Sequence, residues 1–362
     1  MSFTKPLISQ ILMKYRLFLN RIVYHLILLV LLVNMVSCKP TEQISKEKPI
    51  SNNKYDSSPA GVSIDKSIKE ISESVKKIDV IAFYKTWYFQ EENEITKETI
   101  SNSKLDDLSN IKIVSNESVS GTAYVVYYNN NTVGLITCAH IITYPDTVYS
   151  YYDEEKTQLK SVSEKIRQQI YITGLSSGED VEVVVMDIDK DIAFLKKLLS
   201  PDDLSLKHPN INVGSTNKLE WGSQIYVLGY PLGNLMLTKG VVSIGKGMKK
   251  RFLSDALYNK GISGSPVFAT LDGSSNFEWI GMATSASAQT FQYLIPDQKS
   301  TDVTDYEGNY KGNINVDEKI LINYGVTHSI AIEEIITFIA RYRPIITEKG
   351  FHSDLLPTKI KN

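Results

Sequence analysis

The sequence contains little that could cross-link the chain or attract nucleic acid. Two cysteines among 362 residues are too few for a disulfide scaffold or a four-cysteine metal site. Lysine and arginine number 39 against 41 aspartate and glutamate, so the net charge of -2 gives no overall attraction to nucleic-acid phosphates. The sequence also lacks a phosphate-binding loop and an HExxH zinc motif. With 42% hydrophobic residues, the chain should fold as a globular protein on its own core.

The longest hydrophobic run, residues 22–36, has fifteen residues, whereas a membrane-spanning helix needs about 20. It follows a basic cluster at positions 14–21 and ends at Ser37 and Cys38, which is the layout of an export signal. A short N-terminal anchor helix is the alternative. The small residue before Cys38 resembles the lipobox of bacterial lipoproteins, with Met35 standing where that pattern prefers Leu, Val or Ile.

This resemblance implies a signal peptide over residues 1–37 and lipid attachment at Cys38. The chain would then be exported from a bacterial cell as a membrane-anchored lipoprotein facing the periplasm or the cell surface. Its translation could start at Met1 or at Met13. Residues 38–61 are polar, with three prolines and no apolar period, and are predicted to form a disordered tether.

The remaining chain shows a helical pattern near each end and strand patterns between them. Isoleucines and valines recur at helical spacing over residues 67–78 and 330–341. The expected strands are 80–84, 122–128, 133–137, 181–186, 224–228, 240–244, 265–269 and 278–284. The three asparagines at 129–131 are typical of a hairpin turn, because asparagine tolerates positive φ. Many strands with flanking surface helices indicate an all-β sandwich or barrel.

Three short segments have the residue types of nucleophilic catalysis. The first, Gly121 to Ile142, delivers His140 just past the end of a strand. In the second, DIDKDIAFLKK, Asp191 opens an apolar run, where a carboxylate needs a donor such as a histidine N–H to offset its desolvation. Asp187 and Asp189 compete for this role, but neither directly precedes such a run.

The third segment is GISGSPVF, in which glycines flank Ser263 on both sides. Gly261 and Gly264 supply the backbone freedom for a tight turn. The backbone N–H groups of Gly261 and Ser263 are candidates for an oxyanion hole, which stabilises negative charge that develops on the attacked carbonyl oxygen. Together the three segments predict a triad in which Ser263 attacks, His140 accepts its proton and Asp191 orients the imidazole.

These segments resemble the motifs of the chymotrypsin-fold, or trypsin-like, serine proteases. LITCAH is similar to that family's histidine motif, DIAFLK to its aspartate motif and GISGSP to its serine motif, in the same chain order. WGSQIYVLGYPLG and the Ser-Asp-Ala before the serine segment resemble the bacterial high-temperature-requirement branch. The residues after Ala288 are too few for the PDZ module that this branch usually carries.

The resemblance implies a double six-stranded β-barrel over residues 62–345, followed by a C-terminal tail over 346–362. It implies a serine endopeptidase that hydrolyses peptide bonds through an acyl-enzyme, with a polypeptide substrate and neither metal nor organic cofactor. The substrate would pair as an extra strand with Thr284, Ser285 and Ala286. Leu257 matches the floor of the primary specificity pocket, which argues for a small or apolar side chain before the cleaved bond. Nothing in the sequence indicates the oligomeric state.

One position departs from the family. Ile262 replaces the Asp or Asn that normally precedes the nucleophile, so activation by pairing that Asp with a newly cut N-terminus is excluded. Two alternatives stay open at this point. The chain could be a catalytically inactive, protease-like binding or scaffold lipoprotein, or a cysteine peptidase using Cys138. The alternation of side chains at a strand end argues against the second, because Cys138 lies two residues from His140.

Overall fold

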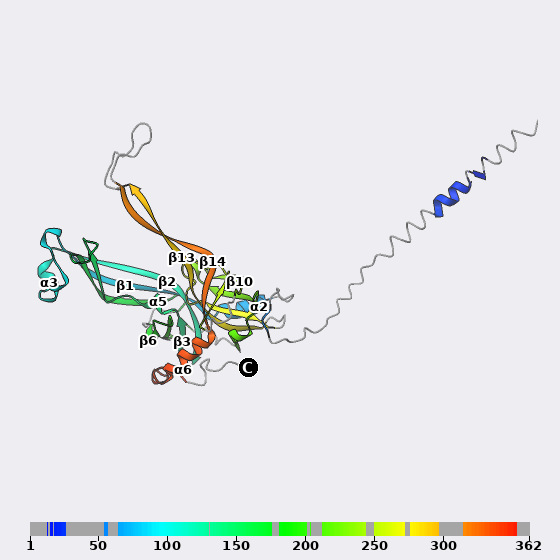
Figure 1. The fold of residues 1–362 in the computed structure, drawn as a ribbon. Helices are drawn as coiled ribbons and strands as arrows, with labels where there is room; N and C mark the ends of the chain where they lie inside the picture. Colours follow the sequence, from blue (N-terminus) through cyan, green and yellow to red (C-terminus); the bar gives the residue numbers. More distant parts are fainter. Residues whose placement is uncertain are drawn as a thin grey trace, which may run out of the picture. The chain divides into compact units, whose positions relative to one another are not determined.

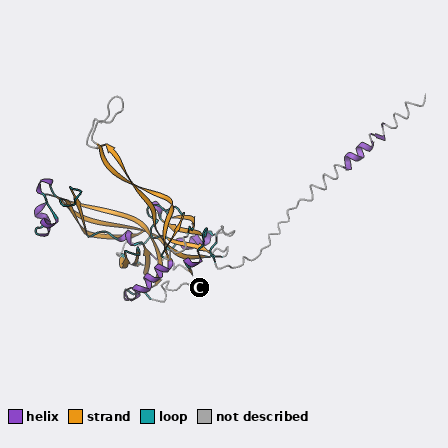
Figure 2. Cartoon of the chain, in the orientation of Figure 1, coloured by secondary structure: helices purple, strands orange, loops and turns teal. Residues whose placement is uncertain are grey.

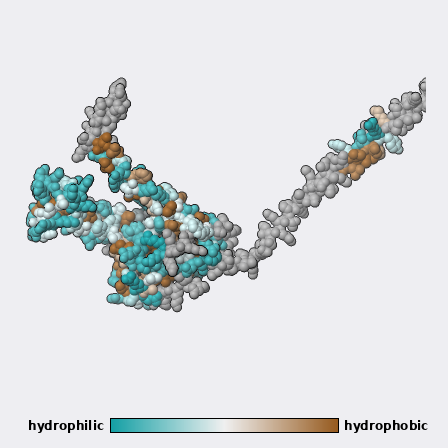
Figure 3. All heavy atoms as spheres, in the orientation of Figure 1, coloured by the Kyte–Doolittle hydropathy of each residue, from teal (hydrophilic) through white to brown (hydrophobic). Residues whose placement is uncertain are grey.

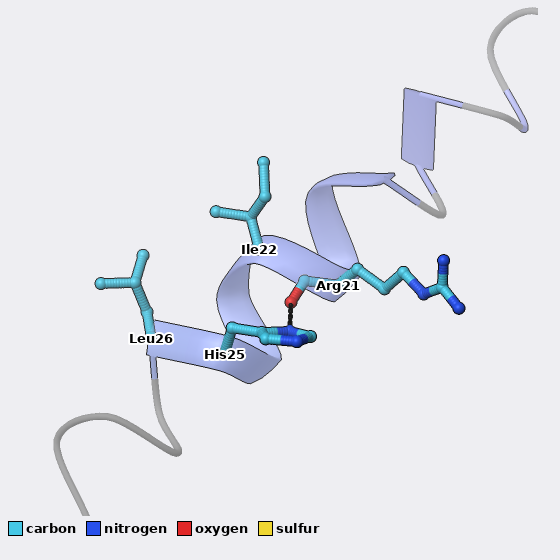
Figure 4. A pocket seen from close by; sticks show the side chains of 4 residues that line it. All are labelled: Arg21, Ile22, His25 and Leu26. Atoms are coloured by element: carbon cyan, nitrogen blue, oxygen red, sulfur yellow. Dashed lines mark hydrogen bonds between the residues drawn. The ribbon is translucent and has the colours of Figure 1, made fainter.

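The computed structural model describes residues 13, 15–16, 18–26, 54–56, 64–129, 131–175, 181–200, 203, 212–243, 250–271, 276–296 and 314–352. The chain divides into two compact units, Met1–Ile50 and Ser51–Asn362. In the first unit residues 18–26 are helical, and Arg21, Ile22, His25 and Leu26 line a shallow hollow in which the His25 ring contacts the Arg21 carbonyl at 2.7 Å (Figure 4). Among the described residues no helix is long and apolar enough to cross a membrane. Cys38 lies outside the described residues.

The second unit is built on two antiparallel β-sheets (Figures 1 and 2). The first sheet has the strand order β4 (Thr147–Tyr151), β5 (Leu159–Ile172), β1 (Val75–Tyr88), β2 (Ile111–Asn129), β3 (Thr132–Thr137), β7 (Ile192–Leu198), β6 (Glu182–Asp187). The second sheet has the order β10 (Met236–Val241), β9 (Gln224–Gly229), β12 (Pro266–Thr270), β13 (Phe277–Pro296), β14 (Ile314–Ala331), β11 (Arg251–Ser254), and β8 (Asn212–Val213) pairs in parallel with β13. The all-β prediction with two β-barrel halves is confirmed, with seven strands in each sheet instead of six.

Short helices connect and cover the sheets. They are α2 (Asp65–Ser72), α3 (Lys97–Ser101), α4 (Leu105–Leu108), α5 (Ala139–Ile142) and α6 (Ile332–Glu348), with 3-10 turns η1 (Glu91–Asn93), η3 (Thr216–Lys218) and η4 (Pro231–Gly233). The predicted C-terminal helix is present, and its Ile332, Ile335 and Ile339 are fully buried.

The predicted helix over 67–78 is wrong in its second half. The helix α2 ends at Ser72, and Val75 and Ile78 belong to β1, where both are fully buried. The pairing of β1 with β2 and β5 outweighs the local helical spacing. The asparagine turn is confirmed, because β2 and β3 pair at Asn129 and Thr132, and Asn131 has a φ of 62°.

A shared apolar core joins the two sheets. Tyr124 of β2 lies edge-on to Phe268 of β12 and Trp279 of β13, with ring centroids 6.0 and 5.0 Å apart. All three side chains are buried, and α6 packs against the same cluster. Because this cluster draws side chains from both sheets, it fixes the first sheet against the second, and the candidate site lies where they meet.

Two predicted boundaries are wrong because aromatic side chains dock outside them. Tyr55, within the predicted tether, is buried against the second sheet, and its hydroxyl donates to Glu278 at 2.7 Å. Phe351, within the predicted C-terminal tail, is buried with its ring 4.9 Å from those of Tyr127 and Phe194. The folded unit therefore includes Tyr55 and reaches Phe351, since burying each ring stabilises the fold by about 1.5–3 kcal/mol.

Parts of both sheets extend beyond the shared core as two arms (Figure 1). We call residues 84–115 and 147–165 the first arm, in which β4, β5, β1 and β2 lie side by side. We call residues 288–296 and 314–322 the second arm, a two-stranded ladder of β13 and β14. The strands β4, β5, β8, β11 and β14 were not predicted, because charged or small polar residues interrupt their apolar pattern.

Candidate active site

His140 lies in a single helical turn that directly follows a strand of the first sheet. Strand β3 ends at Thr137, and α5 begins at Ala139, whose side chain is buried. The His140 side chain is 48% exposed, so it projects from this anchored turn toward solvent. A rigid buried strand followed by an exposed imidazole is a geometry suited to proton transfer.

Asp191 lies in the turn between β6 and β7 of the same sheet and contacts His140. The turn is closed by a hydrogen bond from the Asp191 N–H to the Ile188 carbonyl, at 3.1 Å, and Asp191 adopts a φ of 60°. Aspartate tolerates this left-handed conformation better than most residues. The turn aims the carboxylate at His140, whose Nδ1 lies 2.9 Å from both Asp191 oxygens. The backbone N–H of His140 donates to Asp191 Oδ1 at 2.9 Å as well.

Thr284 of the second sheet supplies a further donor to Asp191. Its hydroxyl donates to Asp191 Oδ2 at 2.5 Å. Burial raises the pKa of Asp191, but the hydrogen bonds from His140 and Thr284 outweigh it and hold that pKa below its ordinary value of 3.8. The carboxylate is therefore ionised at neutral pH and can hold Nδ1 as the protonated ring nitrogen, which leaves Nε2 available as a base.

Ser263 lies in the tight turn that the sequence predicts. Gly261 and Gly264 have φ values of 98° and 88°. A Cβ at Gly261 would lie 2.4 Å from the Tyr230 carbonyl oxygen, and one at Gly264 would lie 1.9 Å from the Thr122 carbonyl oxygen. Only glycine fits both positions, for steric and conformational reasons. The hydroxyl of Ser263 donates to the Thr284 carbonyl at 2.8 Å, and among the described residues no hydrogen bond joins it to His140.

The predicted oxyanion donors have no hydrogen-bond partner among the described residues. Neither the Gly261 nor the Ser263 N–H donates to another protein atom within the described part of the chain. The carbonyls that precede them are both engaged, since Lys260 accepts from the Leu232 N–H at 2.7 Å and Ile262 accepts from the Ser265 N–H at 3.0 Å. In a trans peptide the C=O and N–H point in opposite directions, so these bonds keep the carbonyls turned away from where the two N–H groups point.

Thr122 of β2 ties the serine turn to the first sheet. Its hydroxyl donates to the Gly261 carbonyl at 2.8 Å and accepts from the Tyr230 N–H at 2.9 Å. Its backbone N–H donates to the Ser263 carbonyl at 2.8 Å. Thr122 is fully buried, so these bonds are shielded from water. One residue of the histidine-bearing sheet therefore holds both ends of the Gly261–Ser263 segment.

Ile262 has an apolar role in place of the ion pair found in pancreatic-type enzymes. Its side chain is 2% exposed and packs in the core of the second sheet with residues such as Tyr258 and Val267. Its N–H donates to the Asn259 carbonyl at 3.0 Å. Hydrophobic burial thus anchors the middle of the turn, and no charged partner is required.

Cys138 is buried beside the pair but has the properties of a structural thiol. It is fully buried and free, and its thiol donates to the Ala283 carbonyl at 3.4 Å. Burial raises its pKa well above the ordinary value, and the nearby Asp191 charge adds to this. A nucleophile or metal ligand must be a thiolate, so the chemistry disfavours a cysteine peptidase.

Cys138, His140 and Asp191 also bring together atoms of types that can bind a metal ion. One ligand atom each from Cys138, His140 and Asp191 lie within 4.8 Å of one another. The Asp191 oxygens already accept from three protein donors, and Cys138 is held protonated. These residues therefore fit a hydrogen-bonded carboxylate–imidazole pair better than a cation site.

The other predicted residues are placed as follows. Thr284 is buried, whereas Ser285 is exposed and Ala286 partly exposed on β13. Leu257 lies in the loop before the serine turn and is 56% exposed; its assignment to a specificity pocket stays a prediction. The structure brings His140, Asp191, Thr284 and Ser263 into one continuous set of contacts.

Sequence reasoning missed two positioning residues. In the sequence Thr122 is one residue of a predicted strand, and Leu232 is one residue of the GYPLG motif. Neither has a reactive side chain. The GYPLG stretch is a usable signal for a turn at Leu232, because proline and glycine are typical turn residues; its contact with Lys260, 28 positions later, is decided by the fold.

One family model matches part of the chain. The family model described as "Trypsin-like peptidase domain" matches residues 121–275, a range that contains His140, Asp191 and Ser263. This match supports a peptidase, a hydrolase whose substrates are polypeptides.

No curated protein matches the chain. Among solved structures, the thermostable serine protease AL20 from an extremophilic microorganism matches at 12% identity with a TM-score of 0.31, covering 60% of this chain and 87% of its own.

Proposed function

We propose that the chain is a serine endopeptidase in which His140, Asp191 and Ser263 act as a catalytic triad. The observation that carries the proposal is the hydrogen bonding of the ionised Asp191 to His140 Nδ1, with the Thr284 hydroxyl as a second donor to the same carboxylate. The two unpaired N–H groups of the serine turn support an oxyanion hole beside it.

The proposed reaction has two balanced steps. Ser263 Oγ attacks the peptide carbonyl carbon while His140 Nε2 takes its proton, and the tetrahedral oxyanion is stabilised by the Gly261 and Ser263 N–H groups. His140 then donates the proton to the leaving amine as the peptide bond breaks, leaving an acyl-enzyme. Water hydrolyses this ester with His140 again accepting and returning the proton. For Ser263 to enter this reaction, its hydroxyl must turn from the Thr284 carbonyl to His140.

A fluorophosphonate probe tests the proposal, because it phosphonylates only a serine activated by its surroundings. We expect the purified full chain to be labelled at Ser263, with loss of labelling in Ser263→Ala and after heat denaturation. A folded protein that takes up no label, and that hydrolyses no peptide from a randomised pool, would rule out an assembled catalytic site.

A protease-like binding protein is the second candidate, and the bond from Ser263 to the Thr284 carbonyl favours it. If that bond persisted in the presence of peptide, the serine would stay out of reach of His140. Peptide binding that is equal in the parent and in Ser263→Ala, with no hydrolysis by the parent, would identify this function.

We further propose that the chain is exported and anchored by lipid on Cys38, as a lipoprotein of a bacterial envelope. The support is the sequence pattern alone, a basic segment, a short apolar run and a small residue before the cysteine. Metabolic labelling with a palmitate analogue should mark the parent and not Cys38→Ala. Equal labelling of both would contradict the anchor.

A further inference from the structure

The second arm lacks the support that stabilises the first. In the first arm four strands lie side by side, and Trp87, Phe89, Ile95, Leu159 and Val162 bury an apolar cluster of their own. The second arm has only two strands, and Ala288–Pro296 pairs with Ile314–Ile322 in unbroken register. A two-stranded ribbon is at best marginally stable in water, and a third strand normally makes such a sheet stable.

The second arm also exposes apolar side chains on both of its faces. Leu294, Val316 and Ile320 are exposed by 67%, 64% and 69% on one face, and Phe291 is exposed by 48% on the other. Brown, hydrophobic surface is visible along this arm in Figure 3. Exposed apolar surface of this kind is typical of a site that binds another polypeptide.

The two edges of the second arm differ in charge. From Trp279 to Pro296, β13 contains no charged residue. The facing strand β14 carries Asp317, Glu318 and Lys319 in the arm, and Gly325 at its base has a φ of 89°, which interrupts the extended backbone. Proteins usually protect a free edge with charges, and β14 has them whereas β13 does not. An added strand is therefore expected on β13.

The free edge of β13 runs directly into the candidate active site. The pairing with β12 ends at Met282, and the Ala283 N–H and C=O then bond to Ser265 and Gly264 beside the nucleophile. The next carbonyl, that of Thr284, accepts the Ser263 hydroxyl. From Thr284 to the tip of the described ladder, no strand of the described part of the chain pairs with β13 on that side.

We propose that the second arm is an extended substrate-binding track, on which the polypeptide N-terminal to the cleaved bond adds as a third strand to β13. The proposal rests on the proposed function, since the residue whose carbonyl is attacked would donate its own N–H to the Thr284 carbonyl. The chain preceding that residue then continues along Ala288–Pro296, antiparallel to β13. At about 3.3 Å per residue, the arm accommodates roughly ten extended residues beyond those at the active site.

The chemistry of the track selects a class of substrate. Backbone groups along the β13 edge bond to any extended chain, while the uncharged, partly apolar faces favour segments rich in β-branched, aromatic and small polar residues. Such segments are buried in folded proteins, so the track favours unfolded polypeptides over native ones. Because these contacts are equally strong in the bound substrate and in the transition state, they should lower KM more than they raise kcat.

The test uses two pools of fluorogenic peptides with the same randomised cleavage window. The long pool carries an N-terminal extension of about ten alternating threonine and valine residues, and the short pool lacks it. Thr290→Lys places a charge on the β13 edge strand, and the matched control Ile320→Lys places the same charge at its cross-strand partner on β14. Binding of the long pool is also measured by fluorescence anisotropy in Ser263→Ala and in the Ser263→Ala/Thr290→Lys double variant.

We expect the parent to cleave the long pool with a kcat/KM at least about tenfold higher, mainly through KM. Thr290→Lys should remove this advantage, Ile320→Lys should keep most of it, and neither should change cleavage of the short pool. Equal cleavage of both pools, or an advantage that survives Thr290→Lys, overturns the track while leaving the proposed function standing.

Peptide binding to the Ser263→Ala variants distinguishes failure of the proposed function from failure of the track. If no pool is cleaved but Ser263→Ala binds the long pool and the double variant does not, the track stands and the proposed function fails. If Thr290→Lys instead converts a dimer into a monomer in sedimentation and leaves peptide binding unchanged, the β13 edge pairs with a second copy of the chain and the proposal is wrong.

Discussion

The His140–Asp191 half of the site is held by side-chain hydrogen bonds, whereas the Ser263 half is held by its backbone. Asp191 accepts from His140 and Thr284, so its orientation depends on three polar contacts. The Ser263 turn depends on two glycines at positive φ and on the buried Ile262. The difference predicts that the first half will be sensitive to loss of charge, and the second to changes of shape and burial.

The largest expected effect is on the first half. Asp191→Asn keeps the size of the side chain but removes the charge that holds Nδ1 protonated, so kcat/KM should fall by about 10⁴, by analogy with serine-protease triads. Peptide hydrolysis measures it, and an unchanged circular-dichroism spectrum is the control. Retention of most activity would move the orienting role to Asp187 or Asp189.

Ile262→Asp should destabilise the fold around the Ser263 turn. The substitution restores the residue type of pancreatic-type enzymes, but here it buries a carboxylate in an apolar cluster and should cost about 3 kcal/mol or more. Urea denaturation measures this cost. The matched variant Ile262→Val should lose only about 1 kcal/mol. A stable Ile262→Asp protein would mean that an unseen cation pairs with this position.

Thr122→Val tests the connection between the halves. It removes the hydroxyl that joins the Tyr230 N–H to the Gly261 carbonyl, and the freed oxyanion turn should lose about 10² in kcat. Thr122→Ser keeps the hydroxyl and should stay within a few-fold of the parent. Equal losses in the two variants would show that packing of the methyl group, not the hydrogen bonds, holds the turn.

The pH dependence of stability should come from the first half. Because the folded-state pKa of Asp191 is lowered, its contribution to stability is fully present above about pH 4 and is lost as the pH falls through the folded value. The Asp191→Asn variant should therefore lose less stability than the parent between pH 5 and about pH 2. Identical acid unfolding curves would contradict the assignment.

The smallest effect should follow from Leu232→Gly. Leu232 has a φ of 53° and is 72% exposed, so glycine relieves its strain and keeps the N–H that bonds to Lys260. We expect stability to rise by up to about 1 kcal/mol with unchanged activity. Leu235→Gly is the matched control, because Leu235 is exposed at a negative φ and glycine there should not stabilise. A loss of activity in Leu232→Gly alone would show that the side chain itself supports the turn.

Prediction succeeded where a local pattern was sufficient. The β2–β3 hairpin, the apolar run after Asp191 that forms the buried β7, and the turn around Ser263 each depend on short-range signals, namely Asn, consecutive apolar residues and paired glycines. It failed where distant segments decide the outcome. Tyr55 and Phe351 lie in polar surroundings in the sequence, and only their docking on the folded sheets makes them part of the core.

The sequence by itself determined the reactive residue types, their order along the chain and the all-β class, because nucleophile, base and glycine turn are recognisable over a few residues. Only the tertiary structure decided which groups support them. Thr284 reaches Asp191 from the second sheet and Thr122 reaches the serine turn from the first, contacts between residues 93 and 139 positions apart. Such pairings arise from the packing of the two sheets, and so does the free β13 edge, because a strand's open side depends on which other strands pair with it.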